Sequence, residues 1–250
     1  MTAESRFVHA LVLGLDPAWR RLPEPQRCED ARSFVAAVEH APGVRTHTYS
    51  MVGLQAQADL VIWRLGVSLE ALEEAAAAAL RTGMGRWMTV RESFLGLIQT
   101  SQYVKKPTEQ EQSLFSGERS RYLVVYPFTK STEWYLMGRD ARQGVMNEHM
   151  RIGHDYPEVR QLLANSFGLD DMDFLIAYEM DDLDAFSRLV RELRGSESRR
   201  STVRDTPILT AVHRPLTEIT VLLGAVEDAR IGPPPPLRGT SPREGGRGGP

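Results

Sequence analysis

Residues 121–128 read Arg-Tyr-Leu-Val-Val-Tyr-Pro-Phe, and residues 6–15 read Arg-Phe-Val-His-Ala-Leu-Val-Leu-Gly-Leu. Both stretches are apolar and begin with a basic residue followed by an aromatic one. Runs of this kind are typical of buried strands. Because one lies near the start of the chain and the other near its middle, they indicate that one structural pattern occurs twice.

The segments that follow each stretch support this duplication. In the first half, apolar residues at helical spacing predict helices over 29–40 and 68–81, and strand-like runs cover 44–52, 58–63 and 93–99. In the second half we predict, in order, a helix over 140–154 that continues over 158–165, strands over 166–169 and 173–179, a helix over 183–194 and a strand over 208–213. The order of elements therefore repeats.

The repeated order predicts an α+β fold of two tandem ferredoxin-like repeats, whose antiparallel sheets form a barrel with the helices outside. We place the N-terminal repeat at residues 1–105, a polar linker at 106–120 and the C-terminal repeat at 121–224. Residues 225–250 are rich in Pro and Gly and contain few side chains to bury. Such a composition predicts a disordered tail.

Composition narrows the classes of partner. The chain has 30 basic and 33 acidic residues, a net charge of −3, which gives no global field for binding nucleic acid or an anionic membrane. The apolar run Phe7–Leu15 is too short and too polar for a signal peptide or a spanning helix. Cys28 is the only cysteine, so no intramolecular disulfide can form, and we expect a cytoplasmic protein.

His149 is the first candidate for chemistry. On the predicted helix its neighbours at −4 and +3 are Val145 and Ile152, so the imidazole projects from a mainly apolar face. It is either a core histidine bonded to a backbone carbonyl or a ligand of haem iron. His154 points elsewhere, which argues against a zinc or two-metal site.

Tyr126 and Lys130 are the next candidates. Pro127 removes a donor from the strand, so the strand loosens here and the phenol and the ammonium lie at the mouth of a sheet. A lysine can hold a propionate as a point charge, and a tyrosine can give up an electron and a proton together. The alternatives are a structural tyrosine and a solvated lysine.

These residues, together with Glu133–Leu136, Glu148–Gly153 and Ser166–Asp171, resemble the chlorite dismutase and coproheme decarboxylase superfamily over residues 121–214. The resemblance implies two ferredoxin-like repeats, an iron porphyrin (haem or coproheme) as cofactor and a homo-oligomer, commonly a pentamer. It agrees with the duplication inferred from the order of elements.

The resemblance also implies roles for single residues. His149 matches the proximal iron ligand, Tyr126 the tyrosine that becomes a radical and attacks a propionate, and Lys130 the lysine that positions this propionate. Gln161 matches the distal residue, with Arg160 and Leu162 left open by a register uncertain by about one position. Arginine at the distal position is typical of chlorite-degrading members, whereas a neutral glutamine favours propionate chemistry.

A porphyrin with four carboxylates needs further cations. Candidates are Arg199 or Arg200 and Arg119 or Arg121, of which we take Arg121 and Arg200, while Tyr103, just before the linker, could bond a propionate. Asp170-Asp171 and Asp181-Asp182 occupy turns or helix starts and are interpreted as caps.

The resemblance implies a peroxide-dependent coproheme decarboxylase that forms haem b, with porphyrin and hydrogen peroxide as partners. Two alternatives stay open. One is chlorite dismutation to chloride and dioxygen in the same fold, and the other is a haem-binding or cofactor-free small-ligand module without rapid turnover.

Overall fold

The computed structural model describes residues 6–99 and 118–225. Its strands are β1 (Phe7–Leu15), β2 (Val44–Ser50), β3 (Leu60–Gly66), β4 (Met88–Leu97), β5 (Tyr122–Lys130), β6 (Arg160–Asn165), β7 (Phe174–Met180), β8 (Thr202–Arg204) and β9 (Leu209–His213). Its α-helices are α1 (Glu24–Glu39), α2 (Leu69–Arg81), α4 (Thr132–Leu136), α5 (Arg139–His154), α6 (Leu183–Gly195) and α7 (Leu216–Leu223). Three 3-10 helices are η1 (Pro17–Arg21), η2 (Gly83–Trp87) and η4 (Glu197–Ser201).

Strand pairing confirms the duplicated α+β fold. The sheet order is β7-β6-β4-β1-β3-β2-β9-β5-β8, and β7 also pairs with β5, so eight antiparallel strands close into a ring with β8 attached to β5. Within the ring the first half has the order β2-β3-β1-β4 and the second half β6-β7-β5-β9. These orders are identical when β1, β2, β3 and β4 are matched in turn with β5, β6, β7 and β9. The halves join where β4 meets β6 and β2 meets β9.

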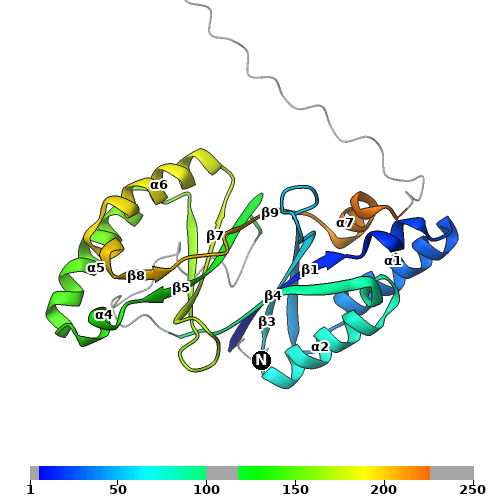
Figure 1. The fold of residues 1–250 in the computed structure, drawn as a ribbon, viewed down its shortest axis with the longest axis horizontal. Helices are drawn as coiled ribbons and strands as arrows, with labels where there is room; N and C mark the ends of the chain where they lie inside the picture. Colours follow the sequence, from blue (N-terminus) through cyan, green and yellow to red (C-terminus); the bar gives the residue numbers. More distant parts are fainter. Residues whose placement is uncertain (1–5, 100–117, 226–250) are drawn as a thin grey trace, which may run out of the picture.

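The helices lie outside this barrel, on opposite sides of it (Figure 1). Helices α1, α2 and α7 cover the first half, and α4, α5 and α6 cover the second (Figure 1). The caps follow from sequence: the Ser68 side chain accepts from the Ala71 backbone N–H at the start of α2, and the Asp182 side chain accepts from the Asp184 N–H at the start of α6. None of the helices in residues 6–99 and 118–225 has the length and apolar composition needed to cross a bilayer.

The two halves differ in what lies between sheet and helices. In the first half, Leu11 and Leu13 of β1 pack into a core cluster with Trp19, Phe34 and residues of α7. At the matching positions of β5 the second half has Tyr126 and Phe128, which only border a smaller cluster. The first half is therefore filled, whereas the second leaves space beneath α5 and α6.

The expected helix over 158–165 and strand over 166–169 are wrong. Residues 160–165 form β6, which pairs with β7 along its whole length. Residues 166–169 form a turn in which the Leu169 N–H donates to the Ser166 carbonyl and Gly168 takes φ +68°. Leu162-Leu163-Ala164 favours a helix by local propensity, but α5 ends at His154 ahead of Tyr156-Pro157, and the ladder with β7 then decides the conformation.

Candidate functional site

A cavity of about 450 Å³ lies in the second half, between the outer face of the sheet and the helices α5 and α6. Alternate residues of the strands form one wall, because side chains of a strand point to opposite faces in turn. They are Tyr126, Phe128 and Lys130 of β5, Phe174, Ile176 and Tyr178 of β7, and Leu163 and Asn165 of β6. The volume lies within the range of small-molecule sites.

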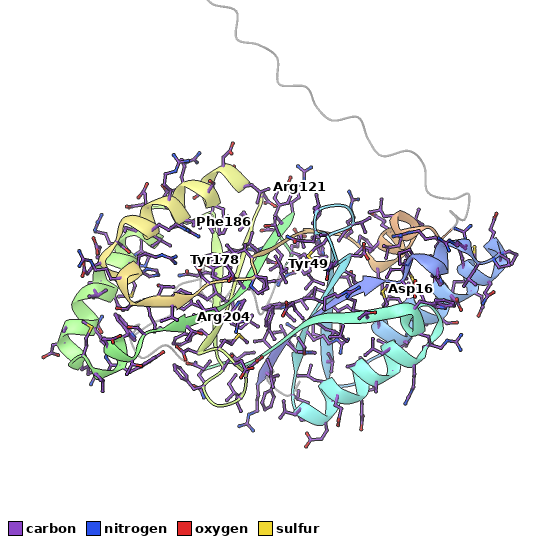
Figure 2. All side chains as sticks on the ribbon, in the orientation of Figure 1. Asp16, Tyr49, Arg121, Tyr178, Phe186 and Arg204 are labelled. Atoms are coloured by element: carbon purple, nitrogen blue, oxygen red, sulfur yellow. The ribbon has the colours of Figure 1, made fainter. Side chains whose placement is uncertain are left out.

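The opposite wall comes from helices and from the segment after α6. It contains Met146 and His149 of α5, Phe186, Val190, Leu193 and Arg194 of α6, and Ser198, Arg199, Thr202, Asp205 and Ile208 of the following segment. Tyr178 of β7 and Phe186 of α6, both labelled in Figure 2, come from opposite walls, and their ring centroids are 5.2 Å apart. The cavity is mainly apolar, with a few charged groups.

His149 projects from α5 into this cavity, as its apolar helix face predicts. Its Nδ1 lies 3.2 Å from Ser198 Oγ. Burial, with a smaller contribution from the nearby Lys130 charge, lowers the pKa of His149 to about 4. The imidazole is therefore neutral at physiological pH, which is the form that binds metal ions.

A chain of hydroxyls fixes the tautomer of His149. Ser196 Oγ donates its only proton to the Leu193 carbonyl at 2.7 Å, so in the 3.0 Å contact between the two serines Ser198 Oγ is the donor. Having given its proton to Ser196, the Ser198 oxygen can only accept from His149 Nδ1–H. Nε2 then carries the lone pair, and no group in the described residues hydrogen-bonds to it.

Lys130 lies at the end of β5 and is buried. Its Nζ donates to the Ser198 carbonyl at 2.7 Å and lies 4.6 Å from the centroid of the Trp134 ring. Burial first, and then the charge of Arg199, lower the pKa of Lys130 to about 8. The same short segment around Ser198 thus holds both the ammonium and the imidazole.

Tyr126 faces Tyr178 on the neighbouring strand, with stacked rings whose centroids are 6.2 Å apart. Burial raises the pKa of Tyr126 well above its ordinary value, and the adjacent Tyr178, which also shares a hydrogen bond with it, adds to this effect. Burial also raises the pKa of Tyr178. Tyr126 is therefore a neutral phenol beside a second neutral phenol.

Among residues 160–162, the Gln161 side chain faces the helices. From β6 it lines a smaller cavity together with His149 of α5. Leu162 packs into the barrel interior, and Arg160 points to the same side, where its Nη2 lies 3.0 Å from Glu179 Oε2. Among the three candidates for the distal position, only Gln161 is therefore directed toward the imidazole side of the sheet.

Arg160 belongs to a buried ionic cluster inside the barrel that links the two halves. Glu179 is fully buried and lies 3.5 Å from Arg119, and Tyr49 of β2 donates a hydrogen bond to it. This pairing accounts for the inward direction of Arg160. Arg119 is thus committed to Glu179, away from the cavity.

The remaining predicted cofactor contacts lie elsewhere. Arg121 is at the start of β5, near the top of the view in Figure 2, with its guanidinium 5.2 Å from the Tyr122 ring centroid. The Arg200 side chain is 81% exposed and paired with Glu197 at 3.2 Å. Neither residue is among the described ones that line the cavity. Tyr103 lies outside the described residues.

The segment after α6 supplies residues that sequence reasoning did not select. Ser198 and Asp205 line the cavity, and so does Arg199, the neighbour of the chosen Arg200; Arg194, at the end of α6 itself, lines it too. The segment reaches the cavity because β8 pairs with the end of β5, where Lys130 lies opposite Thr202. No spacing rule marks this contact, since it depends on pairing between residues about 70 positions apart.

Fold and cavity together define an eight-stranded α+β barrel protein with one neutral imidazole exposed to an apolar cavity. The family model for chlorite dismutase matches residues 25–214, and the chain belongs to the chlorite dismutase family. A coproheme decarboxylase from Mycolicibacterium smegmatis is 31% identical over 183 residues, which cover 73% of this chain and 78% of that protein.

Solved structures agree with this assignment. The chlorite dismutase from Candidatus Nitrospira defluvii in complex with imidazole is 28% identical with a TM-score of 0.80, over 89% of this chain and 97% of that one. A mutant of the same protein matches with a TM-score of 0.80 and 28% identity over 88% and 96% of the two chains. These matches confirm the superfamily inferred from residues 121–214.

Proposed function

We propose that this protein is a coproheme decarboxylase, which uses hydrogen peroxide to convert two propionates of iron coproporphyrin III to vinyl groups and so forms haem b. For each propionate, the carboxylate, one peroxide and one proton give a vinyl group, CO₂ and two waters. The observation that carries the proposal is the presence of His149, Tyr126 and Lys130 around one cavity. The similarity to the coproheme decarboxylase of Mycolicibacterium smegmatis supports it.

The cavity suits an iron porphyrin. Its walls are mainly aromatic and aliphatic, as a flat macrocycle requires, and the Nε2 lone pair of His149 would hold the iron. Lys130, Arg194 and Arg199 provide positive charge for carboxylates. Gln161 is not among the described residues that line this cavity, but it lines the smaller one with His149, is neutral, and would not hold an anion there as an arginine does.

The bound iron with peroxide would supply the oxidising equivalents. The residues of this chain would hold the iron and bring the propionate to the oxidant. His149 would hold the iron, with its orientation set by Ser198. Tyr126 would pass the oxidising equivalent to a propionate that Lys130 positions. Tyr178, whose ring stacks on that of Tyr126 with centroids 6.2 Å apart, would hold the phenol in place.

The direct test is to add coproheme and then peroxide to the purified protein, and to separate the porphyrin products by mass. We expect two successive losses of CO₂ and two hydrogens, ending at haem b. Binding of coproheme without any product would instead favour a haem-binding module without turnover. Absence of a Soret band after titration with coproheme would favour a cofactor-free module.

Chlorite dismutation is a second candidate, because the similar solved structures include a chlorite dismutase. We expect haem-loaded protein to release little dioxygen from chlorite, since neutral Gln161 stabilises an oxychlorine anion less well than arginine does. An oxygen electrode measures this directly. Gln161→Arg is expected to raise the rate, and rapid dioxygen release by the wild type would contradict the preferred function.

The pH dependence of coproheme affinity is expected to report Lys130. Because its pKa is about 8, Lys130 is charged below that pH and attracts a carboxylate, and it loses the charge as the pH rises. A bound carboxylate would raise this pKa, so affinity should fall from about pH 8 upward until the pKa of the complex is passed. Soret titrations of the wild type and Lys130→Met measure the slope. An equal slope in both proteins would contradict this role.

Two further expectations accompany the function. We propose a homopentamer, which light scattering of the purified full chain would measure, and the cytoplasm as the place of reaction. The single Cys28 is compatible with a reducing compartment.

A further inference from the structure

Asp205 is the only acidic side chain among the described residues that line the large cavity. Its Oδ2 lies 2.5 Å from Arg199 Nη1 and 3.7 Å from Arg194 Nη2, and the carboxylate is 21% exposed. One carboxylate thus occupies both arginines of the cavity. An anion at this position is unexpected in a site that would receive a porphyrin with four carboxylates.

The Asp205 carboxylate lies near Tyr126, which suggests a role for it in the reaction. Both side chains line the same cavity, and the Asp205 charge raises the pKa of Tyr126 while that of Arg194 lowers it. Electrostatic influence of this kind requires proximity. Asp205 and Arg194 are therefore close to the phenol that is proposed to act on a propionate, and Arg199 shares the same carboxylate.

We propose that Asp205 is an internal substitute for a substrate carboxylate: it pairs with Arg194 and Arg199 in the free protein, yields them to the propionate that reacts at Tyr126, and pairs with them again once that carboxylate has left as CO₂. This inference rests on the proposed function and adds a determinant of specificity. Asp205 and the arginines would distinguish porphyrins by the carboxylate at this corner of the cavity.

The exchange has opposite consequences for substrate and product. Coproheme must displace Asp205 from the arginines, so part of its attraction to them is offset by the lost pairs. Haem b has a vinyl group at this corner and leaves the Asp205 pairs intact. Removing the Asp205 charge should therefore strengthen coproheme binding and leave haem b binding nearly unchanged, since the arginines meet no new partner in the product.

The experiment compares Soret titrations of coproheme and of haem b with the wild type, Asp205→Asn and Asp205→Ala. We expect both variants to bind coproheme about tenfold more tightly, the scale of one charge-assisted hydrogen bond, and haem b within about twofold of the wild type. The matched control is Glu197→Gln, which removes an acid of the neighbouring η4 whose partner is the exposed Arg200. Its two affinities should equal those of the wild type. Circular dichroism and melting temperature establish that each variant is folded.

The two sets of affinities distinguish the proposed role of Asp205 from the alternatives. If Asp205 only tethers its segment to α6, both variants lose affinity for both porphyrins, and the inference is overturned while the proposed function stands. Equal tightening of coproheme and haem b also overturns it, since the acid would then act as a general repulsive charge. If the wild type binds neither porphyrin, the proposed function fails and this inference with it.

Discussion

Tyr126→Phe is expected to bind coproheme with nearly unchanged affinity and to lose decarboxylation by at least about a hundredfold, the scale of removing a group that takes part directly in the reaction. The phenyl ring keeps the stacking with Tyr178, whose ring centroid is 6.2 Å away. Only the hydroxyl is lost, and with it the atom that exchanges a proton and an electron. Product formation per peroxide, followed by mass, is the measurement.

The matched control for this variant is Tyr122→Phe. Tyr122 lies on the same strand and faces the same side of the sheet, but it is not among the described residues lining the cavity. Its loss should leave turnover unchanged. Full turnover by Tyr126→Phe would remove the proposed role of the tyrosine, and equal losses in both variants would mean that removing a hydroxyl from β5 merely disturbs the fold.

His149→Gly is expected to remove the axial ligand of the iron. Coproheme would then bind at least about tenfold more weakly, and the spectrum of a five-coordinate histidine complex should be lost. Added imidazole should restore that spectrum in part, because the variant leaves space for a free imidazole near Ser198 Oγ, which lies 3.2 Å from Nδ1 in the wild type. Absorption and resonance Raman spectra measure both effects.

His40→Ala is the control for the loss of a histidine as such, since His40 is exposed at the end of α1 and bonds only its own helix among the described residues. It should behave as the wild type. An unchanged coproheme spectrum in His149→Gly would contradict the assignment of the ligand.

Patterns within single elements predicted much of this site. The apolar run at 121–128 predicted a strand with Tyr126 and Lys130 at the mouth of a sheet, and helical spacing placed His149 on an apolar face, because such patterns depend only on local geometry. The strand β6 was missed for the opposite reason: Leu162-Leu163-Ala164 favours a helix locally, and only pairing with β7 makes it a strand. Local propensity cannot report a partner strand.

Which arginines line the cavity could not be predicted from the sequence either, because this also depends on tertiary structure. Arg199 and Arg200 are neighbours with the same chemistry, and which one enters the cavity depends on the direction of η4 after α6. The roles of Ser196 and Ser198 depend equally on that direction. Neither serine has a sequence pattern of its own, and their hydrogen bonds to His149 and Leu193 emerge only once α5 and α6 are side by side.

The contrast between the filled and the open half has a consequence for folding energetics. Leu11 and Leu13 complete an apolar interior with their own neighbours, whereas Tyr126 and Phe128 line the cavity, where a bound macrocycle would add contacts. The ligand would thus act as a missing interior side chain as well as a reactant. At a free concentration one hundred times its dissociation constant it would add about 2.7 kcal/mol to the free energy of unfolding. Release of the product would remove this contribution, so each catalytic cycle would alternately raise and lower the stability of the half that contains the cavity.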